Sequence, residues 1–507
     1  MKIVLFIIIS VPVLQIKSMP ALLGEIDVLK SAQLLPGIQS GGEGNSGLYV
    51  RGGGPDQNLI LLDEAVVYNA AHLFGFFSVF NADAIKDINI IKGGMPAEYG
   101  GRLSSVLDIS MKDGNNQKYE AEGGIGLLSS RLTVQGPLEK NKSSFIISGR
   151  RTYVDVLSKP FLNEDNAFNG SGYYFYDLTT KVNYKIDDND RIYLSGYFGR
   201  DVFSFSNSDN DIAISIPWGN ATTSLRWNHL FNDKLFMNTS LIFSDYRFEF
   251  NIAQSQFELK IFSGINDWNT KVDFLYQPNQ RHTIRFGTNY TYHEFTPGNA
   301  SGRSGDVIFE PEEIFKQYSN EGAIYLSDDI EVTDALKIHA GLRYSSFQHS
   351  GYISLRDYIK NEITSSSDNY RHIEPRFSFR YRLNTKNSIK GAYTQNYQYI
   401  HLASTSAVSL PTDLWVPSSS VIKPKFSEQY AIGYFKNLNE NMFETSIEAY
   451  YKEMDNLLEY KEGVLPEDNT NSSSDDAFTF GTGDSYGIEL LIKKNTNLLK
   501  IKFKEKY

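Results

Sequence analysis

The sequence predicts a compact α+β domain followed by a large antiparallel transmembrane β-barrel. Three observations favour this fold class: long segments alternate apolar and polar residues, short turns alternate with long connections, and the composition is aromatic yet polar. Aromatic residues make up 14% of the 507 residues, with 32 Tyr and 33 Phe, while the mean hydropathy is negative. A sheet with one lipid face and one wet face needs that mixture.

The alternation extends over about ten residues in several segments from the middle of the chain. In residues 336–345, one face carries Leu342 and Tyr344, while the other carries His339 and Arg343. Two further segments alternate in the same way: EPRFSFRYR at 374–382 and RHTIRFGTNYTYH at 281–293. In a membrane barrel, one face of each strand contacts lipid and the other can line water.

The lengths of the connections are the stronger argument for a barrel. Short polar turns recur near Lys140, Asp188, Asn232, Pro278, Thr333, Thr385 and Asn439. The connections between them are often long, at about 157–174, 296–320, 348–370, 398–427 and 457–483. Outer-membrane barrels have short turns on one side and long loops on the other. A β-propeller is the alternative, because a spacing of about 45 to 55 residues resembles a blade repeat, but a blade contains four short strands rather than two long ones.

The strand count predicts an incomplete barrel between residues 118 and 495. Seven short turns imply about fourteen strands, and the segment GDSYGIELLIKKN at 483–495 adds one, which makes about 15. An open sheet edge in lipid leaves backbone groups unsatisfied, so an outer-membrane barrel must close. The odd, interrupted series therefore indicates a truncated barrel, and the Lys-rich residues 496–507 are expected to form a non-barrel tail.

The residues before the barrel, at 18–115, are expected to form the α+β domain. Residues 18–37 predict a helix, because Pro20 suits a first turn and a Pro-Gly pair suits the end. Short apolar runs such as LILL and INII follow between glycine-rich turns, which predicts short strands. Residues 1–17 fit either a signal-like segment, since a lysine precedes about a dozen mostly apolar residues, or the first strand of this domain.

Composition and residue spacing disfavour several classes of site. The chain has no Cys, which excludes disulfides, thiolate metal sites and cysteine nucleophiles. A formal net charge of -11 disfavours a nucleic-acid surface. No Ser-His-Asp arrangement can be argued, and the following histidines show no metal-ligand spacing to carboxylates: His282, His293, His339 and His372. We therefore expect a protein that is not an enzyme, without a cofactor or a metal site.

A glycine-rich loop stands out at residues 47–69, GLYVRGGGPDQNLILLDEAVVYN. Such loops often bind phosphate, but this one lacks the GK[ST] element and no helical pattern follows it. We expect Gly52, Gly53 and Gly54 to allow a tight turn and a close approach of the backbone to the barrel wall.

This loop, together with DAIKDINIIKGGMPAEYGGRLSSVLDIS at 83–110, resembles the plug domain of TonB-dependent outer-membrane receptors, in the form common among Bacteroidetes. The resemblance rests on an ordered series of residues: Arg51, Gly52, Gly53, Gly54, Asp63, Lys92, Gly93, Tyr99, Gly100 and Gly101. LPTDLWVPSSSVIKP at 410–424 also resembles a stretch of that barrel. The resemblance implies a 22-stranded barrel that the plug occludes from within.

The resemblance also implies a function and partners. A receptor of this family lies in the outer membrane of a Gram-negative bacterium, contacts its lipid, and takes up a solute, here unidentified, by coupling to the TonB–ExbB–ExbD complex. Two features depart from the family pattern: Glu64 follows Asp63 where a glycine is usual, and no segment before residue 20 resembles the TonB-contacting box. The alternatives are a non-transporting fragment, an outer-membrane binding scaffold without TonB coupling, or a soluble propeller-type protein.

Two plug arginines suggest how the plug could be held. Arg51 and Arg102 are hypothesised to pair with glutamates that face the lumen, such as Glu444 or Glu448, in a latch that leaves the plug extractable. The alternative is that either arginine is merely solvated. Residues that bind the solute do not follow from the sequence, because specificity resides in variable loops.

Overall fold

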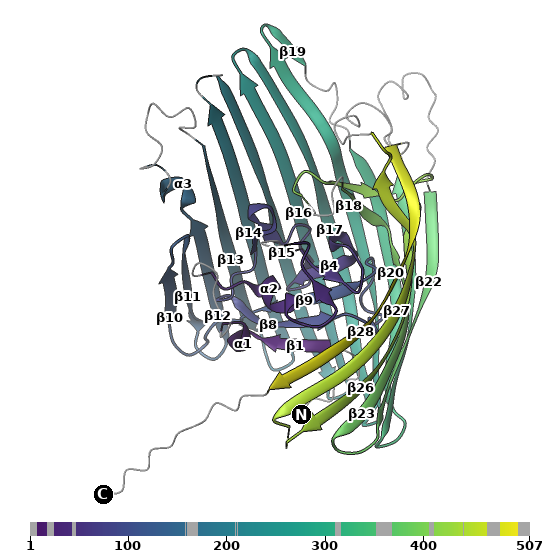
Figure 1. Ribbon diagram of the computed structural model, residues 1–507. Coiled ribbons are helices and arrows are strands. Elements are labelled where there is room, and N and C mark those ends of the chain that lie inside the picture. Colours follow the sequence, from purple (N-terminus) through teal and green to yellow (C-terminus); the bar gives the residue numbers. More distant parts are fainter. Residues whose placement is uncertain are drawn as a thin grey trace, which may run out of the picture.

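The computed structural model describes residues 8–17, 25–42, 47–157, 159, 171–207, 209, 211–309, 316–350, 368–404, 410–439, 441–463 and 477–494. Within them, a small N-terminal domain lies inside a large curved sheet whose strands wrap around it (Figure 1). No helix among the described residues is long and apolar enough to cross a membrane. The expected tail at 496–507 lies outside the described residues.

The curved sheet is antiparallel and contains 17 strands in the described residues. In chain order they are β10 (Glu120–Ile125), β11 (Ser129–Glu139), β12 (Ser143–Thr152), β13 (Gly172–Lys185), β14 (Asp190–Asn207), β15 (Ile212–Asn232), β16 (Leu235–Gln254), β17 (Phe257–Asn279), β18 (His282–Ser304), β19 (Val307–Phe309), β20 (Gln317–Glu331), β21 (Leu336–Ser350), β22 (Asp368–Arg382), β23 (Asn387–Gln398), β26 (Lys425–Leu438), β27 (Phe443–Tyr460) and β28 (Phe478–Lys494). Consecutive strands pair, β18 also pairs with β20 past the short β19, and β23 pairs with β26. No pairing in the described residues joins β10 to β28, so this sheet is not closed.

All seven predicted short turns join neighbouring strands of this sheet, which confirms the strand pattern. The predicted number of about 15 strands was too low because two short strands escaped the pattern. β10 has the sequence EAEGGI, whose glycines and glutamates have low strand propensity. β19 has only three residues and lies within the long connection expected at 296–320.

Four neighbouring strands are unusually long. β15, β16, β17 and β18 contain 21, 20, 23 and 23 residues, about twice the length needed to span a bilayer. Their ends opposite the short turns project beyond most of the other strands (Figure 1). A two-residue turn joins β16 to β17 there, so this side of the sheet has long hairpins where loops are usual.

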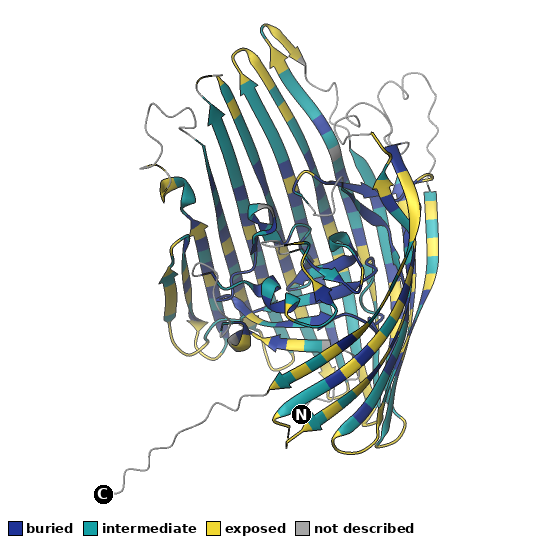
Figure 2. Ribbon diagram, in the orientation of Figure 1, coloured by how far each residue is buried: buried dark blue, intermediate teal, exposed yellow. Residues whose placement is uncertain are grey.

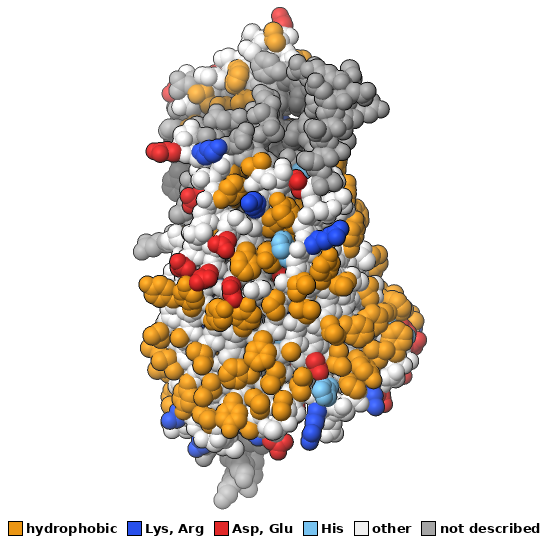
Figure 3. Space-filling model, turned by 90° about the vertical axis from the view of Figure 1, so that its right-hand side faces the viewer, with side chains coloured by type: hydrophobic (Ala, Val, Ile, Leu, Met, Phe, Trp, Pro, Cys, Tyr) orange, Lys and Arg blue, Asp and Glu red, His pale blue; other side chains and the backbone are white. Residues whose placement is uncertain are grey.

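The two faces of the strands are arranged as the alternation predicted. On β21, Leu342 and Tyr344 are exposed on the outside, whereas His339 and Arg343 are buried on the inside. The same alternation runs along the plug-facing part of most other strands of the sheet (Figure 2). On the side of the molecule shown in Figure 3, hydrophobic side chains cover much of the lower half of the outer surface, with charged side chains below and above them. The apolar face is therefore the outer one, as expected for a wall that contacts lipid.

The N-terminal domain is built on a five-stranded sheet with the order β1-β8-β9-β4-β5, in which β4 and β9 are parallel. Its strands are β1 (Ile8–Pro12), β4 (Asn58–Leu62), β5 (Ala65–Val66), β8 (Ile85–Ile91) and β9 (Ser105–Met111). Its other elements are α1 (Val13–Lys17), α2 (Val28–Gln33), β2 (Ile38–Gln39), β3 (Tyr49–Val50), η1 (Pro55–Gln57), β6 (Ala71–His72), η2 (Leu73–Gly75) and β7 (Phe77–Ser78). Apolar side chains such as Leu29, Ile88, Ile90, Leu107 and Ile109 form its core.

The start of this domain differs from the prediction. Residues Ile8–Pro12 form β1 and pair with β8, while residues 1–7 lie outside the described part. The helix expected at 18–37 is limited to α2, and residues 18–24 are not described. The side chain of Asp27 accepts a hydrogen bond from Lys30 N at 2.9 Å. It therefore caps the helix at a position where the sequence pattern suggested helix interior.

Two elements extend from the curved sheet. The short helix α3 (Val154–Leu157) follows β12, and the hairpin of β24 (Ile400–Ala403) and β25 (Leu414–Pro417) interrupts the connection from β23 to β26. β25 reaches across and contacts β17 and β18.

Candidate functional site

The surface between the N-terminal domain and the inner wall of the curved sheet is the candidate functional site. Charged side chains are costly to bury unless they are paired, so a surface at which buried ion pairs join two parts of the chain is a candidate for function. Buried ion pairs cross this surface near β27 and β28 and again near β12 to β14.

Arg51 makes the first group of contacts, with the last two described strands of the wall. Its Nε donates a hydrogen bond to Glu489 Oε1 at 2.8 Å, and its Nη2 donates one to Glu448 Oε2 at 3.2 Å. Lys92 forms an ion pair with the same Glu489, and the guanidinium of Arg51 lies 4.9 Å from the ring centre of Tyr450. Two cations therefore face two carboxylates in a buried cluster, which we call the Arg51 cluster.

The glycines of this region allow close contact with the wall at specific positions. Gly52 has a φ of +75°, and a Cβ there would lie 2.3 Å from Ser485 Oγ on β28. At Gly100, a Cβ would lie 2.3 Å from Arg343 Nε on β21. Larger residues at these two positions would push the domain away from the wall. The other glycines face different neighbours: Gly53 and Gly54 face residues of the domain itself, Gly93 faces Arg51, and Gly101, at φ +74°, faces Glu321 of β20.

The remaining predicted residues lie outside the Arg51 cluster. Arg102 donates a hydrogen bond to Gly101 O at 2.8 Å and lies over the ring of Trp415, and neither of these contacts is with Glu444 or Glu448. Glu444 sits opposite Lys493 in the β27–β28 pairing. Two predicted residues of the plug signature remain. Asp63 forms an ion pair with Lys181 at 2.9 Å, and the hydroxyl of Tyr99 donates a hydrogen bond to Asp108 at 3.1 Å.

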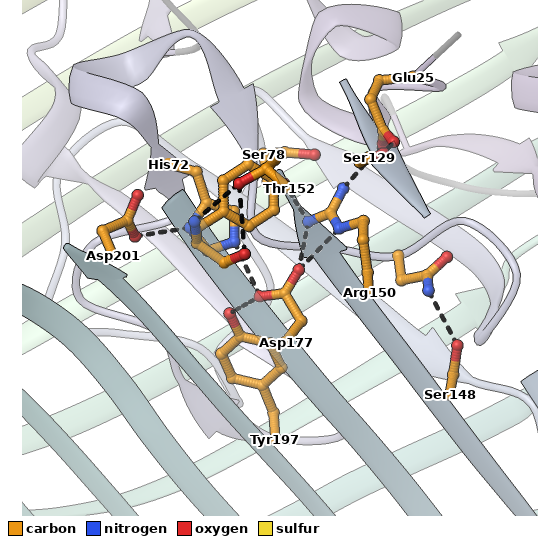
Figure 4. Close-up of polar contacts among 12 residues, drawn as sticks. Glu25, His72, Ser78, Ser129, Ser148, Arg150, Thr152, Asp177, Tyr197 and Asp201 are labelled. Carbon is orange, nitrogen blue, oxygen red and sulfur yellow. Dashed lines mark hydrogen bonds and ion pairs between the residues drawn. The ribbon is translucent and has the colours of Figure 1, made fainter. Parts of the chain in front are cut away.

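His72 makes a second group of contacts that the sequence did not suggest (Figure 4). Its Nε2 lies 2.8 Å from Asp177 Oδ1 on β13, and its Nδ1 lies 2.6 Å from Asp201 Oδ2 on β14. The imidazole stacks on Phe175 with 3.9 Å between ring centres. The side chains of His72, Asp177 and Asp201 are all at most 2% exposed.

Further charged and hydroxyl groups surround His72. Arg150 of β12 pairs with Asp177 at 2.6 Å and with Glu25 of the N-terminal domain at 3.2 Å. The hydroxyls of Tyr197 and Tyr173 donate to Asp177 and Asp201 respectively. We call these residues the His72 cluster. Burial alone lowers the pKa of His72, but the two aspartates outweigh it and raise the pKa to about 9.

Family models match both parts of this architecture. The model described as "TonB dependent receptor-like, beta-barrel" matches residues 152–503, and the one described as "TonB-dependent Receptor Plug Domain" matches residues 8–105. The barrel match alone covers more than half of the chain. The chain belongs to the TonB-dependent receptors.

Several solved structures of transporters and uptake receptors have the same fold. The FrpB iron transporter from Neisseria meningitidis (F3-3 variant) superposes with a TM-score of 0.67 at 12% identity, over 96% of this chain and 78% of that one. The copper transporter OprC gives 0.68 at 10% identity, over 97% and 78%. The ferric yersiniabactin uptake receptor FyuA from Yersinia pestis gives 0.64 at 13% identity, over 96% and 76%. The N-terminal domain is therefore the plug, and the curved sheet is the wall of its barrel.

Glu64, the departure from the usual receptor sequence, also contacts the wall. It lies in the turn between β4 and β5, and its φ of +76° belongs to the left-handed region. Its carboxylate accepts hydrogen bonds from Asn238 at 2.9 Å and from Ser240, and lies 3.7 Å from Arg226 Nη1. Burial raises the pKa of Glu64, but the charges of Lys271 and Arg226 and the hydrogen bonds together lower it by more than burial raises it. The net shift of the pKa is therefore downward.

Sequence reasoning missed His72, Glu25 and Glu489 as parts of this interface. His72 lies in the stretch NAAHLFGFF, which has no periodicity, and its aspartate partners are 105 and 129 residues away. One signal was present, because Asp177 and Asp201 are charged residues on the inner faces of their strands. In the described residues, no group of three or more His, Asp or Glu side chains could hold a metal ion.

Proposed function

We propose that this TonB-dependent receptor takes up a solute across the outer membrane of a Gram-negative bacterium, with the TonB–ExbB–ExbD complex supplying the work that moves the plug. The observation that carries the proposal is the presence of two buried polar clusters between plug and wall, beside an apolar contact in which Phe77 packs with Phe175 and Trp218. The Arg51 and His72 clusters attach the plug by hydrogen bonds and ion pairs that water can replace when the plug moves.

A cavity on the loop side of the plug is the place where we expect the solute to bind. The plug contributes Tyr68 and Asn69 to its lining, β16 contributes Tyr246, and the segment around β25 contributes Asp413 and Trp415. Aromatic rings next to a few polar groups are typical of small-molecule sites. Because residues of both plug and wall form the cavity, a bound solute would contact the part that has to move.

The names of the similar structures supply the first solute class to test. They are described as iron, ferric yersiniabactin and copper transporters. We therefore propose a metal ion or a metal chelate as the solute.

Uptake by whole cells tests the proposal. Cells that lack their own copy of this gene are complemented with the full chain, and entry of radioactive iron, ferric siderophores and copper is measured with and without TonB. We expect uptake of one of these solutes in cells with TonB and a loss of that uptake without it. Equal uptake in both strains, or binding without entry, would favour a scaffold or a passive pore.

A further inference from the structure

The geometry around His72 requires a particular protonation state. Each ring nitrogen lies within hydrogen-bond distance of a carboxylate oxygen, and a carboxylate can only accept. A neutral imidazole has one N–H, so its other nitrogen would direct a lone pair at a carboxylate. Only the imidazolium donates on both sides, so the docked plug holds His72 as a cation.

The charge balance of the cluster supports this conclusion. Each element that packs around His72 contributes a charged group to the cluster. These groups are Asp177 on β13, Asp201 on β14, Arg150 on β12 and Glu25 in the plug. The hydroxyls of Tyr173 and Tyr197 donate to the aspartates. With His72 protonated, two cations face three carboxylates. With His72 neutral, a buried cluster would contain a single cation, Arg150, against those carboxylates.

We propose that His72 is a proton-linked latch: the plug docks with its imidazolium form, and withdrawal of the plug from β13 and β14 lets the ring release a proton to water. The N–H bond that breaks is either Nδ1–H or Nε2–H, and the proton passes to water or buffer. This inference rests on the proposed function in one respect, namely that the plug leaves the wall during transport.

The direction of the pH effect follows from linkage. The docked His72 has a pKa of about 9, whereas in water it would return to the ordinary value of 6.5. A group whose pKa is raised by docking stabilises the docked state fully below the free pKa, and this stabilisation disappears as the pH rises through the docked pKa. Docking should therefore weaken about tenfold per pH unit between about 6.5 and 9, with one proton released per plug.

Thiol labelling of the purified full chain measures this linkage without TonB or solute. The chain has no Cys, so Ser78→Cys introduces one thiol. Ser78 is 1% exposed, and its hydroxyl has no hydrogen-bond partner in the described residues, so the substitution removes no bond. The labelling rate is measured in urea that leaves the barrel folded, as judged by heat-modifiability. The rate for the unfolded chain at the same pH is then divided by this rate. This ratio is the protection factor of the docked plug.

We expect the protection factor to fall about tenfold per pH unit from about pH 6.5 to pH 9 and to be flat below pH 6. His72→Gln should remove this slope. His229→Gln is the matched control, because His229 also bonds an aspartate, Asp190 at 2.7 Å, but lies in the wall away from the plug; it should keep the slope.

A second variant keeps the test decisive if His72→Gln does not fold. Asp201→Asn removes one of the two charges that hold the proton, so the upper end of the sloping range should move to lower pH. The proposal is overturned if His72→Gln keeps the slope, or if Asp201→Asn leaves the upper end of the sloping range where it is in the unmodified protein. Because no uptake is measured, this result stands separately from the question of whether the receptor transports.

Discussion

At the residue scale, the backbone and the side chain of Glu64 favour opposite substitutions. Its left-handed φ of +76° costs a residue with a Cβ about 1 kcal/mol or slightly more, which glycine would avoid. Its carboxylate, however, bonds Asn238 and Ser240 on β16 and faces Arg226. Hydrogen bonds to a charged group contribute about 1.5 to 3 kcal/mol each, so the contacts should outweigh the strain.

Glu64→Gly is therefore expected to weaken plug docking by about 2 to 5 kcal/mol despite the relaxed backbone. Thiol protection in the Ser78→Cys background gives this difference directly. Glu64→Gln keeps the strained backbone and the hydrogen-bond acceptor but loses the charge, and it should give an intermediate value. Greater protection in the glycine variant would show that backbone strain dominates.

Individual residues also show where sequence reasoning stops. The resemblance drew attention to Arg51, and the structure pairs it with Glu448, one of the two glutamates considered. Glu489 faces inward by the same alternation, but alternation gives only the face of a strand. It does not give the height at which a plug residue meets the strand, and Arg51 and Glu489 are 438 residues apart. His72 had no pattern at all, so only the tertiary structure could assign its partners.

At the scale of elements, the strands were predictable because turns and alternation are local. The seven short turns and the apolar outer face follow from residues close in sequence. Short elements such as β10 and β19 have too few residues for a pattern to emerge. The true length of β15 to β18 was also hidden, because alternation continues past the membrane without a marker of where lipid ends.

The outer face of β21 provides a test of the assigned lipid contact. Leu342 is 50% exposed near the middle of this strand. Leu342→Arg should cost about 2 to 4 kcal/mol, as expected for arginine near the middle of the bilayer. The expected result is reduced assembly, seen as loss of the heat-modifiable band in outer-membrane fractions.

Val307→Arg is the matched control for this prediction. Val307 is 61% exposed on β19, at the far tip of the long hairpins. It should assemble like the unmodified chain. Equal assembly of both variants would contradict the assignment of β21 to the lipid face.

At the scale of the whole molecule, the two clusters test whether the plug docks as one body. The Arg51 cluster contacts β27 and β28, the His72 cluster contacts β12 to β14, and their ion pairs have no partner in common. If the plug leaves the wall as a rigid unit, both clusters must break together. Free energies from distant sites then add to within about 0.5 kcal/mol.

Arg51→Gln should therefore lower the protection of the thiol at position 78, although that thiol lies beside the His72 cluster. We expect the double variant with His72→Gln to show the sum of the two single effects at pH 6. Arg247→Gln, at a side chain that is 73% exposed, is the control and should change nothing. If Arg51→Gln leaves protection at position 78 unchanged, the plug is released in parts.

The Arg51 cluster also constrains the order of assembly. Lys17, at the start of the plug, bonds Glu122 on β10, whereas Arg51 and Lys92 bond Glu489 on β28. β10 and β28 are the two edge strands of the described sheet and do not pair with each other there. The plug is synthesised first, yet its contacts to β28 wait for the last described strand. Contacts so distant in sequence form slowly, because the loop between them must close first. During biogenesis the plug must therefore persist without its contacts to Glu489 until the far edge of the sheet is in place.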